Sequence, residues 1–556
     1  MPAPPRISGT ALRSLARFAR TRVGAIALKQ LFLSDLKVSE IAKLPDELFG
    51  DMPVDSRALA GRPPRASSNA GLALPTAPWS GTSATLTDAY RAKRTTPREI
   101  VDRALAAARE LAARTPTVGP LMAYADEVAR READASTARW AAGAPLGPLD
   151  GVPFAVKEQT AVRGFVRGGG TTFEDPAPQT DDATVVARLR AAGGIVIGTT
   201  PMTEYGMTPL GYNPKRAMPR NPHATDRVAG GSSTGSGVSV ATGLVAFALG
   251  VDGGGSIRIP AALSGVFGIK PTWGRVSRFG DLSGGTVAHL GPLASSTLDL
   301  ARVLDAIAAP DPRDPQTDFA PTFVTGAFEK SLARGVKGLR IGVDEHEWSC
   351  CDSSIAQAGR AALRALERDG AVLVDVKPKL ARWAAAMGYL TIGMEDRASQ
   401  RKNIREHLTE YNLDLQISYA VLGALGTVEY CDGLRLRGGL RAEMALLFQD
   451  LDLFALPTTA TTAPRVTDAD MRLGFLDSRA LDAMCRFNFL GNLTGLPALT
   501  APVGRDRDGL PIGLQLVGDA FDDATVLAAS AQLERSGAAR TERPIVTADT
   551  LASARG

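Results

Sequence analysis

Short apolar runs alternate with helix-length amphipathic stretches along the middle of the chain. Residues 183–192 are helical in pattern and lead into the apolar run 195–197. The same rhythm returns in the apolar run 339–343, the amphipathic stretch 355–368 and the apolar run 371–376. Such alternation is typical of a sheet that contains parallel strand pairs and is covered by helices. The pattern therefore predicts an α/β fold.

Local signals place some of these elements more closely. Thr96, Pro97 and Glu99 form a capping-box pattern ahead of Ile100 and Val101, which predicts a helix that begins at Pro97. The apolar segment 238–251 is shorter than the roughly 20 residues that a membrane-spanning helix needs, so it predicts a buried helix followed by a strand.

No linker or repeat interrupts residues 84 to 536, which favours one large domain over several. We assign this domain to residues 79–540. Residues 1–78 form a basic N-terminal extension with a linker at 62–71, and residues 541–556 form a C-terminal tail.

Charge is distributed unevenly along the chain. Residues 1–34 carry six basic and no acidic residues, whereas the whole chain of 556 residues has a net charge of +4. The remaining residues therefore carry about −2, and nothing in them indicates a nucleic-acid-binding face. Four cysteines in a chain of this length are typical of a reducing compartment, which predicts a cytoplasmic location.

The basic extension is itself amphipathic. Arg13, Arg17 and Arg20 share one helical face, with Leu12 and Phe18 elsewhere on the wheel. The pattern fits a helix that makes peripheral contact with an anionic membrane through residues 1–34. It equally fits a transit peptide or a helix packed on the enzyme body.

Candidate chemistry begins with Lys157, at the end of the apolar stretch 151–157. A lysine acts as a base only when it is neutral, and an exposed lysine has a pKa of about 10.4. Burial in a strand would lower that pKa, because a low-dielectric surrounding disfavours the ammonium.

Two glycine-rich loops supply candidate serines. Ser232 lies in the run 230–237 and Ser256 in the run 252–260. The glycines at 253, 254 and 255 allow main-chain N–H groups to converge. We therefore expect the N–H groups of Gly253, Gly254, Gly255 and Ser256 to form an oxyanion hole, in which one donor typically stabilises the transition state by about 2.7–4 kcal/mol.

A competing interpretation makes Ser233 the nucleophile, since residues 231–235 match the Gly-x-Ser-x-Gly elbow of α/β-hydrolases. An elbow follows a buried strand, yet residues 221–227 are loop-like. The chain has only four histidines, and none lies in the late context that such a fold requires. We expect no metal and no cofactor, because the cysteine spacing does not match a zinc site.

Taken together, the motifs around Lys157, Ser232 and Ser256 resemble the Ser-Ser-Lys triad of the amidase signature family. Further family-like stretches follow in order, and the resemblance spans about residues 84–536; they are residues 268–277, 291–294, 311–315 and 509–518. The resemblance implies a central mixed β-sheet with helices on both faces. It also implies a base at Lys157, a proton relay at Ser232 after a cis peptide bond, and a nucleophile at Ser256.

Four positions depart from the family pattern, namely Glu158, Thr234, Val251 and Gly253. They leave the three proton-handling groups intact, so we expect an amidase that hydrolyses a carboxamide C–N bond through an acyl-enzyme. Two alternatives stay open: the amidase-like component of a glutamine-dependent tRNA amidotransferase complex, and an inactive amidase scaffold that only binds.

The sequence does not identify the small-molecule amide that is the substrate. The resemblance places the acyl pocket among variable helices within residues 380–490. The oligomeric state is also open, with a homodimer among the options.

Overall fold

The computed structural model describes residues 6–41, 43–50 and 71–554. Residues 62–70 of the expected linker lie outside that range. The main sheet has eleven strands in the order β2-β4-β3-β5-β7-β6-β12-β13-β10-β8-β9. The strands are β2 (Ala123–Tyr124), β3 (Pro153–Lys157), β4 (Ile195–Thr200), β5 (Phe247–Asp252), β6 (Phe267–Lys270), β7 (His289–Ala294), β8 (Arg340–Val343), β9 (Val372–Asp375), β10 (Leu453–Pro457), β12 (Ala498–Arg505) and β13 (Pro511–Gly518).

The sheet is mixed, as expected. β3 pairs in parallel with both β4 and β5, and β8 pairs in parallel with β9 and β10. The strands from β7 to β13 pair antiparallel, with β5 and β10 joining them to the two parallel parts. β3 is buried at every residue, which explains why its sequence is a continuous apolar run instead of an alternating one.

Helices cover both faces of this sheet. Successive side chains of a strand point to opposite faces. Accordingly, Phe154 and Val156 join one hydrophobic cluster and Ala155 another. The longer helices are α4 (Ser83–Arg91), α5 (Pro97–Ala112), α6 (Asp126–Ala141), α7 (Thr184–Ala191), α8 (Thr234–Ala241), α9 (Arg258–Ser264), α10 (Thr297–Ile307), α13 (Ser353–Arg368), α14 (Ala384–Ser399), α15 (Arg401–His407), α16 (Leu413–Gly423), α17 (Thr427–Leu447), α19 (Ser478–Cys485), α20 (Phe489–Thr494) and α21 (Asp523–Arg535). The shorter ones are α11 (Ala327–Ser331), α12 (Glu345–Trp348) and α18 (Asp468–Leu473).

Local sequence signals predicted several of these elements correctly. α5 begins at Pro97, with the side chain of Thr96 accepting the Glu99 N–H and the side chain of Glu99 accepting the Thr96 N–H. The apolar segment 238–251 forms part of α8 and β5. Among the described residues, no helix combines the length and apolar character needed to cross a bilayer.

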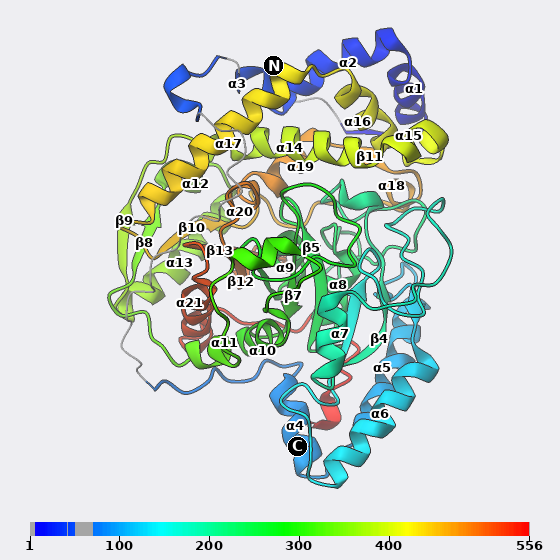
Figure 1. Ribbon diagram of the computed structural model, residues 1–556, viewed down its shortest axis with the longest axis vertical. Coiled ribbons are helices and arrows are strands. Elements are labelled where there is room, and N and C mark those ends of the chain that lie inside the picture. The colour runs from blue at the N-terminus through cyan, green and yellow to red at the C-terminus, as the bar shows by residue number, and fades with distance from the viewer. Residues whose placement is uncertain (1–5, 42, 51–70, 555–556) are drawn as a thin grey trace.

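The N-terminal extension forms a helical hairpin that packs on the enzyme body. It consists of β1 (Ile7–Ser8), α1 (Gly9–Ala19) and α2 (Arg22–Asp35), followed by the short α3 (Val38–Ile41). β1 pairs with β11 (Phe475–Leu476), and α1 and α2 lie beside α16 at the top of Figure 1. Of the three interpretations of this segment, packing on the body is the one observed.

Candidate active site

Lys157 ends β3 deep inside the protein, with 1% of its surface exposed. Its Nζ lies 2.7 Å from Ser232 Oγ and 3.4 Å from the carbonyl oxygen of Val251. Burial lowers the pKa of Lys157 to about 7, although the nearby carboxylates of Asp281, Asp252 and Glu158 partly oppose that shift. A substantial fraction of the lysine is therefore neutral near pH 7, as a base requires.

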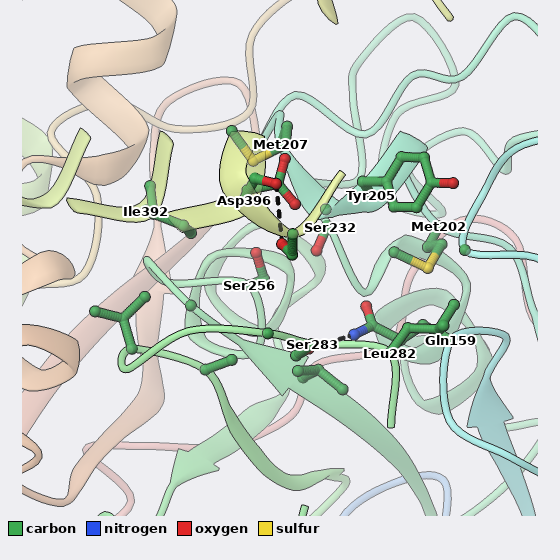
Figure 2. A pocket seen from close by; sticks show the side chains of 18 of the residues that line it. Gln159, Met202, Tyr205, Met207, Ser232, Ser256, Leu282, Ser283, Ile392 and Asp396 are labelled. Atoms are coloured by element: carbon green, nitrogen blue, oxygen red, sulfur yellow. Dashed lines mark hydrogen bonds between the residues drawn. The ribbon is translucent and has the colours of Figure 1, made fainter. Parts of the chain in front are cut away.

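Ser232 lies in the loop that precedes α8. The peptide bond between Gly231 and Ser232 is cis, as the resemblance implies. Ser232 and Ser256 both line the cavity shown in Figure 2, although they come from loops on different elements. The fold thus brings together three groups that are 75 and 24 residues apart in the chain.

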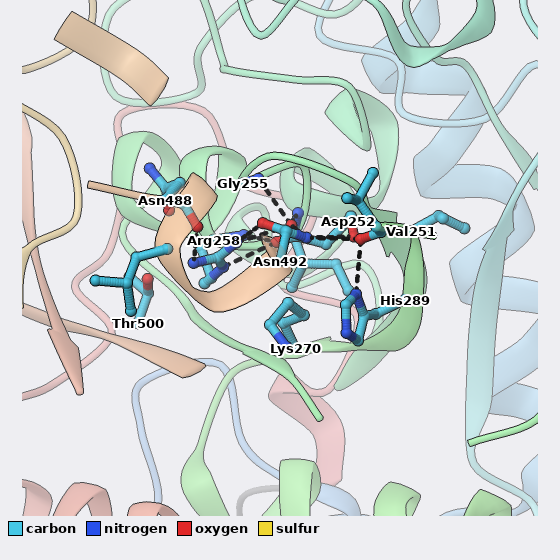
Figure 3. A network of polar contacts seen from close by, with 12 residues as sticks. Val251, Asp252, Gly255, Arg258, Lys270, His289, Asn488, Asn492 and Thr500 are labelled. Atoms are coloured by element: carbon cyan, nitrogen blue, oxygen red, sulfur yellow. Dashed lines mark hydrogen bonds and ion pairs between the residues drawn. The ribbon is translucent and has the colours of Figure 1, made fainter. Parts of the chain in front are cut away.

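Ser256 follows the end of β5 in a loop that Asp252 organises. The carboxylate of Asp252 accepts the N–H of Gly255 at 2.7 Å and of Ile257 at 3.1 Å, and it pairs with Arg258 at 2.9 Å (Figure 3). Burial alone would raise the pKa of Asp252, but the Arg258 guanidinium and these hydrogen bonds hold it well below its usual range. Asp252 and Arg258 are fully buried, so they support the loop and do not face the cavity.

The same contact narrows the expected oxyanion hole. The Gly255 N–H is already taken by Asp252, which leaves Gly253, Gly254 and Ser256 as candidate donors. Gly255 has a φ of +113°, and an added Cβ would lie 2.6 Å from Ile259 and 2.8 Å from Asn488. Only glycine fits there, so Gly255 shapes the loop even though its own N–H is occupied.

Two of the four departures from the family pattern have partners in this chain. At Val251, where a threonine hydroxyl is missing, the main-chain carbonyl oxygen lies near Lys157 Nζ. The carboxylate of Glu158 is paired with Arg216 at 3.2 Å. Thr234 opens α8, where its Oγ1 is buried without a hydrogen-bond partner.

Two cavities meet at Ser256. A small cavity of about 70 Å³ contains Lys157 and Ser232 together with polar side chains, among them Asp396 and Ser283; we call it the polar cavity. A second cavity of about 430 Å³ is lined mainly by apolar side chains of α14, α16, β11 and the N-terminal hairpin; we call it the apolar cavity. Gly206, Met207, Ile392 and Ser256 line both.

The elbow interpretation is wrong for this fold. Ser233 is fully buried, and its Oγ is 3.2 Å from both the nitrogen and the oxygen of Val251, away from either cavity. No strand precedes it. His289, a candidate partner, is buried with its Nδ1 at 2.8 Å from the carbonyl oxygen of Val287.

Sequence reasoning missed several lining groups. Asp281, which acts on Lys157 through its charge, accepts a hydrogen bond from Thr160 at 2.7 Å. Asp396 of α14 lines the polar cavity, and burial raises its pKa to about 7. Neither belongs to a recognisable motif, because both reach the site only through tertiary packing. The expectation that the pocket lies within residues 380–490 holds for α14, α16 and β11 but omits the hairpin.

Comparison with known proteins gives a consistent picture. The family model described as Amidase matches residues 102–527. The chain is 34% identical over 471 residues to a fatty acid amide hydrolase of Oryza sativa subsp. indica, covering 83% of this chain and 77% of that protein. It is also 34% identical over 472 residues to the amidase-like component of the glutamyl-tRNA(Gln) amidotransferase of Anaeromyxobacter sp. (strain K), covering 80% and 94%.

A solved structure agrees with these matches. The native peptide amidase of Stenotrophomonas maltophilia superposes with a TM-score of 0.70 at 26% identity, covering 83% of this chain and 97% of that one. The chain therefore belongs to the amidase signature family and is a hydrolase that acts on the carbon–nitrogen bond of amides.

Proposed function

We propose that this protein hydrolyses amides that join a long apolar acyl group to a polar amine, through an acyl-enzyme on Ser256. The observation that carries the proposal is the meeting of the two cavities at Ser256. A carbonyl carbon at Ser256 would direct its acyl chain into the apolar cavity and its amine into the polar one. At about 430 Å³, the apolar cavity falls within the roughly 300–1,000 Å³ range of small-molecule sites.

In the proposed reaction, Ser256 Oγ attacks the carbonyl carbon and passes its proton to Ser232 Oγ. Ser232 in turn passes its own proton to neutral Lys157, 2.7 Å away. The N–H groups of Gly253, Gly254 and Ser256 stabilise the oxyanion. Lys157 then returns a proton through Ser232 to the amine nitrogen as the C–N bond breaks, and water releases the acid by the reverse relay.

The relatives support this substrate class. Fatty acid amide hydrolases from three plant species match this chain at 33–34% identity over more than 470 residues. Hydrolysis of fatty acid amides agrees with the apolar lining of the larger cavity, which would bury an acyl chain favourably.

The amidotransferase alternative fits the cavities less well. Glutamine carries an α-carboxylate, which proteins commonly bind with a charged partner. Of the described residues that line the two cavities, only Lys157 is basic, whereas Asp35, Asp396, Asp414 and Asp477 are acidic. The alternative predicts glutaminase activity and copurifying partner chains. An inactive scaffold would fail to react with a fluorophosphonate probe.

A series of acyl p-nitroanilides from butyryl to hexadecanoyl tests the proposal. We expect kcat/KM to rise with acyl length, and rapid quenching followed by mass spectrometry to find the acyl group on the peptide that contains Ser256. Equal turnover at every length, or a preference for glutamine, would contradict the proposed substrate class.

Activity is expected to rise with pH. Lys157, with a pKa of about 7, is protonated at lower pH and neutral at higher pH. Below pH 7, kcat/KM should therefore fall about tenfold per unit of pH, since only the neutral amine accepts a proton. Because the charge of Asp281 raises the pKa of Lys157, Asp281→Asn should move this limb to lower pH. A limb that does not move would exclude Lys157 as its origin.

We also propose that the outer face of the hairpin contacts anionic lipid. Phe18, Val23 and Ile26 are exposed there, beside the exposed Arg17 and Arg20. Basic residues near such a surface contribute about 1 kcal/mol each. Cosedimentation with phosphatidylserine vesicles should therefore exceed that with phosphatidylcholine, and should fall when Phe18 and Ile26 are replaced by serine. Equal sedimentation with both lipids, or no loss in the double variant, would remove this role.

A further inference from the structure

The N-terminal hairpin supplies part of the wall of the apolar cavity. Five of its apolar residues line the cavity, namely Ile7, Leu15, Leu28, Leu31 and Leu36. They lie outside residues 102–527, which the family model matches. The cavity that reaches Ser256 is therefore completed by a segment that is not part of the family domain.

The hairpin is held on the body at several points. Arg6 forms an ion pair with Asp470 at 3.0 Å and lies over the ring of Phe475. Lys29 of α2 forms an ion pair with Glu429 of α17 at 2.6 Å. These contacts join opposite ends of the hairpin to the body, so its position relative to the cavity is defined.

An apolar contact fixes the middle of the hairpin. Leu12, Ala16 and Ala19 of α1 are buried against Ile417 and Val421 of α16. Because α16 also lines the apolar cavity, the same helix supports α1 and forms the adjoining wall. The inner face of α1 is thereby held against the cavity, while Arg13, Arg17 and Arg20 remain exposed.

We propose that the N-terminal hairpin is a specificity element that sets which acyl chain lengths the enzyme accepts. The inference rests on the proposed function, in which the acyl group enters the apolar cavity. Gly254 and Ser256 lie at the reactive end of that cavity, whereas Leu31 lines it while 63% exposed and so marks its opening to solvent. A short acyl group bound at Ser256 contacts the body alone, and a long one also reaches the hairpin.

This arrangement makes a quantitative prediction for chain length. Each methylene that leaves water for an apolar wall contributes about fourfold to binding. In the native enzyme, kcat/KM should therefore rise by up to about fourfold per methylene until the chain passes the hairpin. Filling the hairpin part of the cavity should end that rise at a shorter chain.

Leu28→Trp and Leu15→Trp test the inference, since each adds bulk on the cavity side of the hairpin. Gln30→Trp is the matched control, because Gln30 is exposed on the same helix and does not line the cavity. We expect the ratio of tetradecanoyl to butyryl p-nitroanilide turnover to fall at least tenfold in the two leucine variants and to stay near the native value in the control. An unchanged ratio in both leucine variants would overturn the inference.

A binding measurement separates this inference from the proposed reaction. In the Ser256→Ala background, displacement of a fluorescent fatty acid by dodecanoate and hexadecanoate reports the cavity without turnover. Leu28→Trp should weaken hexadecanoate at least tenfold more than dodecanoate, whatever the native enzyme hydrolyses. If both fatty acids weaken equally, or neither does, the hairpin does not set chain length. If the native enzyme cleaves no acyl anilide while the binding shift persists, the proposed function fails and the hairpin assignment stands.

Discussion

Replacing Ser256 by alanine is expected to lower kcat by about 10⁴- to 10⁶-fold, the range found when a hydrolase loses its nucleophile. The change removes one oxygen from a side chain that faces the cavity and for which no side-chain hydrogen bond holds the loop; Asp252 and Arg258 do that. The variant should therefore unfold at nearly the native temperature. Steady-state turnover, fluorophosphonate labelling and thermal unfolding measure the three quantities.

Ser233→Ala is the matched control, because Ser233 is the neighbouring serine of the same motif. Its hydroxyl is bonded to the main chain of Val251, so removal leaves buried polar groups without a partner and should cost about 1–3 kcal/mol of stability. Labelling and most of the turnover should survive. Labelling that persists in Ser256→Ala and disappears in Ser233→Ala would assign the nucleophile to Ser233 instead.

Lys157→Ala is expected to lower kcat by about 10²- to 10⁴-fold, the usual contribution of a general base. Lys157→Met tests the same loss with less disturbance, since methionine nearly fills the space of the lysine stem in this fully buried position. Both variants should lose the limb of the pH profile near 7, because the group that titrates there is gone.

Lys157→Arg should not restore activity. A guanidinium remains charged at every working pH and cannot accept the proton from Ser232. Near-native turnover in the arginine variant would rule out a neutral base at this position. Retention of the alkaline rise in Lys157→Met would assign that rise to another group.

Much of the site was predictable from local sequence. β3 is buried on both faces, so its residues must be apolar, and this made Lys157 stand out at the end of an apolar run. Glycines at positive φ, such as Gly255, cannot be replaced without steric conflict, and they marked the loop around Ser256. The capping box of α5 depends only on residues three apart, which is why its start was predicted to the residue.

Other features were decided by contacts between distant segments. The Gly255 N–H could not be removed from the oxyanion set until the carboxylate of Asp252 was seen to accept it. The Lys157 pKa depends on burial and on Asp281, which lies 124 residues away and belongs to no motif. Such effects follow from distance and desolvation, and the spacing of residues in the chain does not encode either.

The N-terminal extension shows the division most clearly. Its amphipathic pattern determined that it forms a helix with one apolar side, because helical periodicity is a local property. Whether that side meets lipid, another protein or the enzyme itself depends on which complementary surface lies within reach. Only the tertiary structure supplied that surface, in α16 and β11, and with it the part of the apolar cavity that the hairpin completes.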